Sequence, residues 1–273
     1  MPPAAPDPRI EQVPRNLTPL GVYKLRTHTF VVSVPKSGRT WLRFFLRHYM
    51  CRAAGVEFSA KPPLFDRSGL PRVEFTHDLW AHRTAPALWR RATGLYLIPR
   101  NKRRSAKILL LYRDLRDLMV SLHLQLTKRG FKSGAAFQGS VKECVADPLY
   151  GVESTVDIIN HWLDEWRDTD RFMLWNYEDC RKDPEKHFRQ VLEFADLGPV
   201  RDDWLRESIE FSSFDKMKKM EKQGHVNRVM LQPGDPGDPE SFKVRRGVIG
   251  GFRDYLDAED IRRIDQAAAR LRL

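Results

Sequence analysis

The nine residues SVPKSGRTW, at positions 33–41, follow the apolar run TFVV and precede a segment with helical periodicity. This order predicts a strand, a short loop with one glycine, and a helix. The free N–H groups at such a turn and the dipole of its helix favour a bound anion. The stretch therefore predicts a phosphate-binding loop, although an ordinary tight turn between strand and helix also fits these residues alone.

The loop departs from GxxxxGK[ST], the loop pattern of proteins that bind nucleoside triphosphates. Ser33 stands where that pattern has its first glycine, and Arg39 stands at its lysine position. The lysine of this chain lies in the middle of the loop instead. A glycine lets the backbone approach a ligand closely, and hydroxyl and ammonium groups add donors. The residues expected to contact the phosphate are Lys36, Ser37, Gly38, Arg39 and Thr40.

Apolar runs and helical patterns alternate along the rest of the chain. Strands are predicted at 29–34, 73–76, 107–112 and 171–176. Helices are predicted at 40–54, 114–129 and 155–167, and two more begin at Asp183 and at Asp257. This alternation predicts an α/β fold with three layers, α/β/α, around a central parallel sheet. No internal repeat or linker is evident, so we expect a flexible tail over 1–20 and a single domain over 21–273.

The composition limits the partners and the compartment. The chain has 273 residues and a formal charge of +11, which favours anionic partners such as a phosphorylated cofactor, an acidic glycan, a membrane surface or nucleic acid. Three widely spaced cysteines, Cys51, Cys144 and Cys180, indicate reduced thiols. The sequence has no secretory signal and no apolar run of the roughly 18 residues that a membrane helix needs. We therefore expect a cytoplasmic protein.

Two further segments carry side chains suited to anions. Arg113 ends the strand at 107–112, and Ser121 follows two helical turns later; Arg245, Arg246 and Gly247 follow a loop rich in proline and glycine. An arginine binds a phosphate through two parallel hydrogen bonds. Each segment alone also fits an ordinary ion pair or a solvated basic turn. Together with the first loop they indicate a ligand with two separated phosphates.

The chain resembles the sulfotransferases that use 3′-phosphoadenosine 5′-phosphosulfate (PAPS), both the cytosolic enzymes and their bacterial relatives. The resemblance lies in three motifs, which match in order and separation: PKSGRTW (35–41), RDLRDLMVS (113–121) and RRGVIGGFR (245–253). The resemblance extends from about Phe30 to about Asp254. It implies transfer of a sulfuryl group from PAPS to a hydroxyl, with adenosine 3′,5′-bisphosphate (PAP) as the product and no metal. It also implies that the Lys36 loop holds the 5′-phosphosulfate. The implied ligands of the 3′-phosphate are Arg113, Ser121, Arg245, Arg246 and Gly247.

The resemblance also implies roles for individual side chains. Trp41, Tyr177 in WNYEDCRKDP, and Ser212 and Phe214 in SSF match positions near the adenine. A strand-end tyrosine that merely packs, or a helix end at SSF, would fit these residues equally well.

The implied catalytic residues are a base and a cation. His77, in FTHDLW, matches the catalytic base, and a neutral imidazole suits that role at pH 7. Lys36 would provide the positive charge for the oxygen that bridges sulfur and phosphate. His28 and His123 are weaker candidates for the base.

The sequence departs from the family pattern at several positions. Arg39 replaces a small hydroxyl residue, Phe75 stands where the family often has lysine, and Gly251 replaces the usual aspartate. RDYLDAEDIR (253–262) stands where the short dimer motif of the family would lie. We therefore do not expect that form of dimer.

Two other functions fit part of the sequence. A P-loop kinase or another nucleotide-binding protein would need Mg²⁺ and an acidic ligand; Asp114 follows a strand, but Arg113 occupies the better position. A nucleic-acid-binding module would fit the charge. Because it gives no reason for three ordered anion motifs, we expect no nucleic acid partner.

The sequence does not identify the acceptor. We expect its pocket to be formed by the loops 78–106 and 128–150. From Leu79 to Arg113 there are nine Lys or Arg residues and no Asp or Glu. This basic stretch predicts an anionic acceptor, such as an acidic glycan, or an anionic membrane surface, while a solvated basic face explains it equally well.

Overall fold

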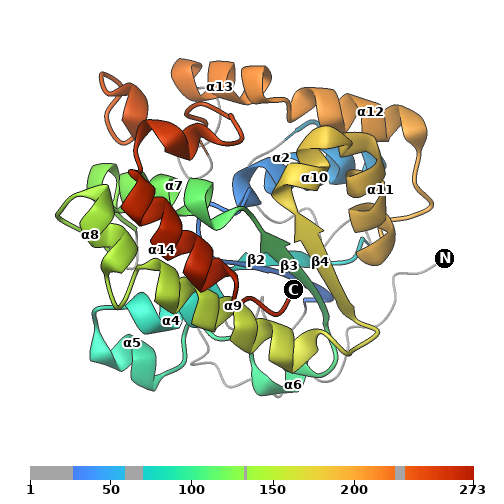
Figure 1. Ribbon diagram of the computed structural model, residues 1–273. Helices are drawn as coiled ribbons and strands as arrows, with labels where there is room; N and C mark the ends of the chain where they lie inside the picture. Colours follow the sequence, from blue (N-terminus) through green and yellow to red (C-terminus); the bar gives the residue numbers. More distant parts are fainter. Residues whose placement is uncertain (1–26, 59–69, 132–133, 225–230) are drawn as a thin grey trace.

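The computed structural model describes residues 27–58, 70–131, 134–224 and 231–273, so the predicted tail over 1–20 lies outside the described residues. A parallel sheet with the strand order β2-β1-β3-β4 forms the centre (Figure 1). Its strands are β1 (Thr29–Ser33), β2 (Val73–Thr76), β3 (Lys107–Tyr112) and β4 (Phe172–Asn176). The four predicted strands are confirmed to within one residue at either end.

Helices cover both faces of the sheet (Figure 1). Phe30 and Val32 of β1 pack with α7 (Leu115–Lys128), α9 (Val152–Trp166) and α14 (Ala258–Ala268), whereas Val31 packs with α2 (Arg39–Ala53), α11 (Pro184–Phe194) and α12 (Asp202–Phe211). Successive residues of a strand point to opposite faces, so an apolar run fills both cores. The three-layer α/β/α prediction is confirmed.

Shorter elements connect this framework. They are α4 (Asp78–Thr84), α5 (Leu88–Ala92), α6 (Arg100–Arg103), α8 (Val141–Ala146), α10 (Tyr177–Lys182), α13 (Phe214–Gln223), and the 3₁₀ turns η2 (Pro239–Ser241) and η3 (Gly251–Asp254). The segment 78–106, expected as a loop, thus contains three short helices.

Local sequence signals set the ends of two predicted helices. The side chain of Asp183 accepts a hydrogen bond from the backbone N–H of Lys186 at 3.1 Å, and Pro184 is the first residue of α11. Asp257 caps α14 in the same way. Such caps satisfy N–H groups that have no partner within the helix. Both predicted starts are confirmed.

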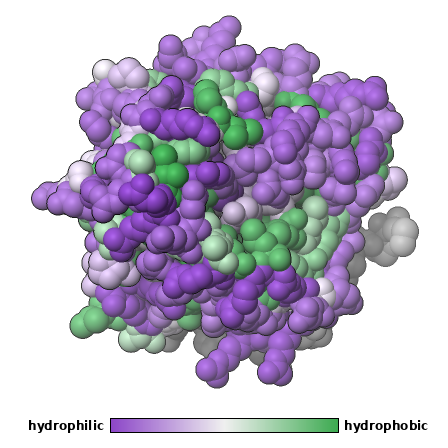
Figure 2. All heavy atoms as spheres, in the orientation of Figure 1, coloured by the Kyte–Doolittle hydropathy of each residue, from purple (hydrophilic) through white to green (hydrophobic). Residues whose placement is uncertain are grey.

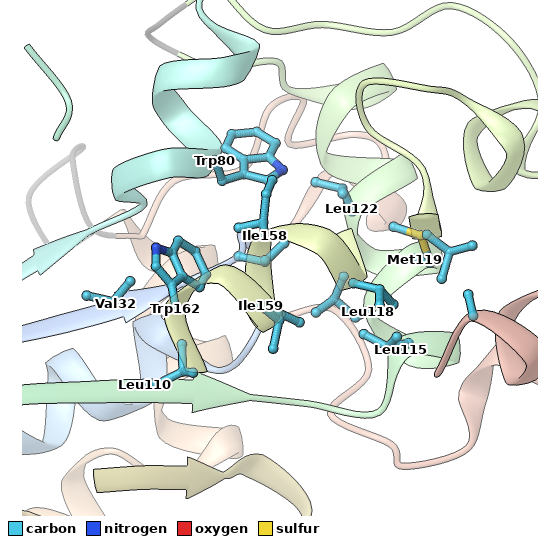
Figure 3. Close-up of a cluster of buried hydrophobic side chains, with 14 of the residues drawn as sticks. Val32, Trp80, Leu110, Leu115, Leu118, Met119, Leu122, Ile158, Ile159 and Trp162 are labelled. Atoms are coloured by element: carbon cyan, nitrogen blue, oxygen red, sulfur yellow. The ribbon is translucent and has the colours of Figure 1, made fainter. Parts of the chain in front are cut away.

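A buried carboxylate fixes the start of α4. Trp80 of α4 and Trp162 of α9 are buried in the core beside β1 (Figure 3). The carboxylate of Asp78 accepts hydrogen bonds from the Trp162 indole at 3.1 Å and from the backbone N–H of Ile98 at 2.7 Å. A buried carboxylate with such partners holds its backbone in one place. His77, the preceding residue, is therefore anchored.

The surface is largely hydrophilic, as a chain with 30% charged residues requires. Figure 2 shows hydrophilic residues over most of one face of the molecule. Within the described ranges, no helix has the length and apolar character needed to cross a membrane.

Candidate active site

A cavity of about 890 Å³ lies at the carboxyl ends of the strands. Its wall is formed by the loop between β1 and α2, the end of β2, one face of α7, and the segment 232–251. Ligands of parallel α/β sheets bind at this edge, where the loops after the strands converge. The predicted anion motifs, which lie far apart in the sequence, meet here.

The loop after β1 has a constrained backbone. Lys36 has φ 77° and Gly38 has φ 93°, both in the left-handed region. A Cβ at Gly38 would lie 2.7 Å from Cδ2 of Tyr177, so this position needs glycine for space as well as for φ. The Ser37 hydroxyl donates to the carbonyl of Val34 at 3.0 Å and is buried. Lys36, Gly38, Arg39, Thr40 and Trp41 line the cavity, whereas the side chain of Ser37 stabilises the loop from within.

Residues spaced by four along α7 and its ends form one side of the cavity. They are Arg113, Asp117, Ser121, Gln125 and Arg129, and all five line the wall. Four residues make about one helical turn, so these side chains share a face. The predicted pair Arg113 and Ser121 is thereby brought together, and Arg129 joins it.

The guanidinium of Arg113 is held from several sides. Its Nη1 donates to the carbonyl of Lys36 at 3.1 Å and lies 3.4 Å from the Ser121 hydroxyl. Its Nη2 lies 3.9 Å from Asp117, and its Cζ stands 4.8 Å from the centre of the Tyr177 ring. Its Nε is buried and has no partner among the described residues. The side chain is thus oriented and retains a donor for a ligand.

The C-terminal motif is docked onto α7. The carboxylate of Asp117 accepts from the backbone N–H groups of Gly250 at 2.7 Å and Phe252 at 3.0 Å. Gly247 has φ 64°, and a Cβ there would overlap the ring of Phe214. Gly247 is therefore required by its conformation and by its neighbour.

The two arginines of this motif line the cavity and are oriented by acidic side chains. Arg245 donates to Glu240 at 3.0 Å and to the Tyr255 hydroxyl. Arg246 pairs with Asp254 at 2.6 Å, and its side chain is 41% exposed. Arg245 is the more enclosed of the two, with its side chain 16% exposed.

Three of the four residues expected near adenine share the cavity wall: Trp41, Tyr177 and Phe214. The rings of Trp41 and Tyr177 have centres 5.7 Å apart in an edge-to-face arrangement. Ser212 has no exposed surface, and its hydroxyl donates to the carbonyl of Ile209 at 3.3 Å. It lies outside the described wall.

His77 lines the cavity with a defined protonation pattern. Its Nδ1 lies 2.8 Å from the carbonyl oxygen of Ser33. A carbonyl accepts but cannot donate, so Nδ1 carries the proton and Nε2 has a free lone pair. Burial, with further contributions from Arg39 and Arg43, holds the pKa of His77 well below its usual value. The neutral form that a base requires is therefore present at pH 7.

Lys36 stands among other cations. Its pKa is lowered to about 7, mainly by burial and then by Arg129, Lys243 and Arg113. Burial and neighbouring arginines also lower the pKa of Lys243 to about 8. A bound anion would raise the pKa of both lysines again.

Sequence reasoning missed four basic residues of the cavity wall: Arg43, Arg129, Arg181 and Lys243. Helical periodicity could have found two, because Arg43 lies four residues after Arg39, and Arg129 eight after Ser121. The two weaker candidates for the base are elsewhere: Nδ1 of His28 accepts from the backbone N–H of Arg72, and Nε2 of His123 lies 2.9 Å from the carbonyl of Gly139.

Both segments expected to form the acceptor pocket contribute to the wall. Trp80, Leu95 and Tyr96 come from 78–106, and Gly130 and Phe131 from 128–150. Of the nine basic residues between Leu79 and Arg113, the described wall includes Arg113 alone. The charges that line this cavity therefore come mainly from other parts of the chain.

Comparison with known proteins identifies the family, because residues 26–271 match the family described as the sulfotransferase domain. The chain belongs to the sulfotransferase family. This sulfotransferase is 24% identical over 248 residues to cytosolic sulfotransferase 12 of Arabidopsis thaliana. The aligned region covers 86% of this chain and 74% of that protein. It is also 24% identical over 243 residues to the 3-beta-hydroxysteroid sulfotransferase of Cavia porcellus, covering 87% of the chain and 81% of that protein.

Solved structures show the same fold. Mouse sulfotransferase SULT7A1 complexed with PAP has a TM-score of 0.59 at 20% identity, with 91% of this chain and 86% of that chain covered. Retinol dehydratase in complex with androsterone and inactive cofactor PAP has a TM-score of 0.57 at 20% identity, with 90% and 81% covered. The resemblance of the three motifs is confirmed: the protein is a sulfotransferase enzyme, and the kinase alternative is not favoured.

Proposed function

We propose that this sulfotransferase transfers a sulfuryl group from PAPS to a hydroxyl of its acceptor, with His77 as the base. The observation that carries this proposal is the arrangement of His77, whose Nε2 has a free lone pair in the cavity that Lys36 also lines. The similar solved structures hold PAP, which supports this donor.

The residues of the cavity fit a nucleotide with two separated anionic groups. Lys36 and the loop around Gly38 would hold the 5′-phosphosulfate at the start of α2, where the helix dipole favours an anion. Arg113, whose buried Nε has no partner among the described residues, would hold the 3′-phosphate. Its partners there would be Ser121, Arg245, Arg246 and Gly247.

Aromatic side chains in the same wall suit the adenine. Trp41 and Tyr177 contact each other edge to face, and Phe214 stands against Gly247. Flat apolar surfaces of this kind bind a base by stacking and packing. Ser212 stays a prediction from the motif, since its hydroxyl bonds within its own segment.

The chain's own residues would divide the chemistry between a base and a cation. When bound, PAPS supplies the sulfuryl group and a phosphate leaving group. His77 takes the proton of the acceptor hydroxyl at Nε2 while that oxygen forms its bond to sulfur. Lys36 places its ammonium against the negative charge that develops on the bridging oxygen as its bond to sulfur breaks. The carbonyl of Ser33 keeps the His77 ring oriented through both changes.

Transfer of ³⁵S from labelled PAPS to a panel of phenols, sterols, lipids and glycans tests this proposal. We expect His77→Ala to lower kcat by about 10²–10⁴-fold, the usual contribution of a general base. His123→Ala is the matched control, because the ring of His123, on α7, bonds the carbonyl of Gly139 in the loop that follows this helix. Full activity of His77→Ala would contradict the base assignment. Calorimetry showing no preference for PAP over AMP, or phosphoryl transfer from Mg-ATP in place of sulfuryl transfer, would contradict the donor.

A further inference from the structure

The cavity has more positive charge than the proposed donor needs. Its wall contains the basic residues Lys36, Arg39, Arg43, Arg113, Arg129, Arg181, Lys243, Arg245 and Arg246, and the acidic residues Glu74, Asp117 and Glu240. Asp117 and Glu240 are engaged by backbone amides and by Arg245. A donor with a phosphate and a phosphosulfate carries about four negative charges, since an ionised phosphate monoester carries up to −2. Part of the cationic wall is therefore available to something other than the donor.

The surplus lies on α2, beside His77. Arg39 and Arg43 are four residues apart on that helix, so both face the cavity and Arg43 lies about 6 Å farther from the loop than Arg39. The Arg43 guanidinium stands 4.6 Å from the centre of the ring of Phe75, which lies on β2, the strand directly before His77. Within the described residues, neither arginine forms an ion pair.

The cations of the cavity form two overlapping groups. The first group, Arg129, Lys243 and Arg113, acts most on Lys36, whereas the second, Arg39 and Arg43, acts on His77 and also on Lys243. The first group lies near Lys36, where the phosphates are proposed to bind. The second group lies near His77, the base that an acceptor must approach.

One carboxylate offsets the second group in part. Glu74 raises the pKa of Arg43, but burial and Arg47 act more strongly in the opposite direction. Glu74 also accepts a hydrogen bond from the Thr27 hydroxyl at 3.2 Å. The pKa of Arg43 is lowered only to about 10, so its guanidinium keeps its positive charge at pH 7.

Apolar side chains of the cavity wall also lie near His77. The rings of Trp80 and Phe131 have centres 5.1 Å apart, and both lie next to His77, at 5.8 Å and 6.4 Å. Leu124 and Val120 continue this surface. An acceptor bound beside His77 could contact these aromatic rings with an apolar body and the two arginines with a charged group.

We infer that Arg43, together with Arg39, forms a subsite for an anionic group of the acceptor, a carboxylate or sulfate carried on the same molecule as the reacting hydroxyl. Arg39, which the sequence predicts as a contact of the donor phosphate, is thereby assigned to the acceptor instead. This inference rests on the proposed function, because the hydroxyl is the one that His77 deprotonates. Phe75 of β2, and His77 directly after that strand, fix the distance between subsite and base. Sulfotransfer would thus favour hydroxyl compounds that are already acidic.

Two probe compounds of the same shape test the subsite: 6-hydroxy-2-naphthoate and 6-hydroxy-2-naphthamide. Calorimetry on the protein saturated with PAP gives their dissociation constants, and ³⁵S transfer from PAPS gives kcat/KM. We expect wild type to bind the carboxylate at least about tenfold more tightly than the amide, as a charge-assisted contact requires. Arg43→Gln should remove most of this preference. Arg47→Gln, the same change one turn farther along α2 and outside the described cavity wall, should retain it.

The readouts separate this inference from the proposed function. If Arg43→Gln binds PAP within about threefold of wild type, its donor site is intact. A lost preference for the carboxylate probe over the amide then reflects a change in acceptor binding. Equal affinity of wild type for both compounds, no binding of either, or an unchanged preference in Arg43→Gln overturns the subsite. Failure of wild type to bind PAP at all overturns the proposed function instead.

Discussion

Basic side chains are concentrated in the cavity and along the stretch 83–104, but they differ in burial and in how the chain brings them together. In the cavity, Lys36, Arg43 and Lys243 come from separate segments, and burial lowers the pKa of each. In the stretch, the charges are adjacent in sequence and mostly exposed, and Arg103 pairs with Glu165 at 2.9 Å. Water and counterions stabilise exposed charges, whereas buried like charges stay unfavourable until an anion binds. The residues that best identify a ligand are thus the ones that the fold assembles.

Loss of a single charge in the cavity should have the largest effect. Lys36→Gln should lower kcat for sulfuryl transfer by about 10²–10³-fold, the usual cost of losing a donor that stabilises developing charge. Arg104→Gln removes the same charge from the exposed stretch and should leave kcat within about twofold. Steady-state turnover of labelled PAPS measures both. Comparable losses in the two variants would show that overall charge, not position, matters.

Removal of Arg113 separates the two phosphates of the donor. Arg113→Ala should weaken PAP binding by about ten- to a hundredfold, since a hydrogen-bonded ionic contact contributes about 1.5–3 kcal/mol. Binding of AMP, which lacks the 3′-phosphate, should hardly change. Calorimetry with both nucleotides makes the comparison, with Arg100→Ala as the exposed control. Equal weakening of PAP and AMP would assign Arg113 a structural role through its bond to the Lys36 carbonyl.

The lowered pKa of Lys36 predicts proton uptake on binding. In the free protein this pKa is about 7, and a bound phosphate raises it, so the complex holds a proton that the free protein loses above pH 7. Affinity for PAP should therefore be greatest below pH 7 and fall about tenfold from pH 7.5 to 8.5, where the phosphates are already ionised. Buffer-dependent binding enthalpies report the proton, and Lys36→Arg, which keeps its charge, should reduce the pH dependence. An affinity independent of pH in wild type would refute the assignment.

The exposed stretch should give the smallest effects. The double variant Arg100→Gln/Arg104→Gln should bind PAP within about twofold of wild type at 0.15 M salt, where charges separated by more than about 8 Å are screened. Its free energy of unfolding should change by less than about 0.5 kcal/mol per substitution. Urea denaturation and calorimetry measure these quantities. A tenfold loss of PAP affinity would mean that the stretch takes part in donor binding, and would remove the distinction between the two regions.

The strands and the phosphate loop could be predicted because their signals are local. An apolar run such as KILLLY, followed by Arg113, indicates a buried strand and a residue at its carboxyl end without reference to the rest of the chain. Asp183 and Pro184 likewise predict the start of α11.

The rest of the site depends on contacts between distant segments. α4, α5 and α6 are too short for a helical period, and α4 is held by the bonds of Asp78 to Ile98 and Trp162. Lys243 reaches the cavity because Glu221 binds its backbone N–H at 2.8 Å. No spacing in the sequence indicates such a contact. Arg43 could have been predicted, because its spacing of four residues from Arg39 places both side chains on one face of α2.

Two buried carboxylates have a consequence for the order in which the site forms. Asp117 holds the backbone of Gly250 and Phe252, and Glu221 holds that of Lys243 and Val244. A ribosome makes the chain from its N-terminus, so all four strands, the last ending at Asn176, are synthesised before this segment. A nascent chain that stops short of residue 243 has the sheet and the Lys36 loop but neither arginine of the C-terminal motif. The two arginines proposed to complete the site of the second phosphate are therefore added late in translation, long after Arg113 and Ser121.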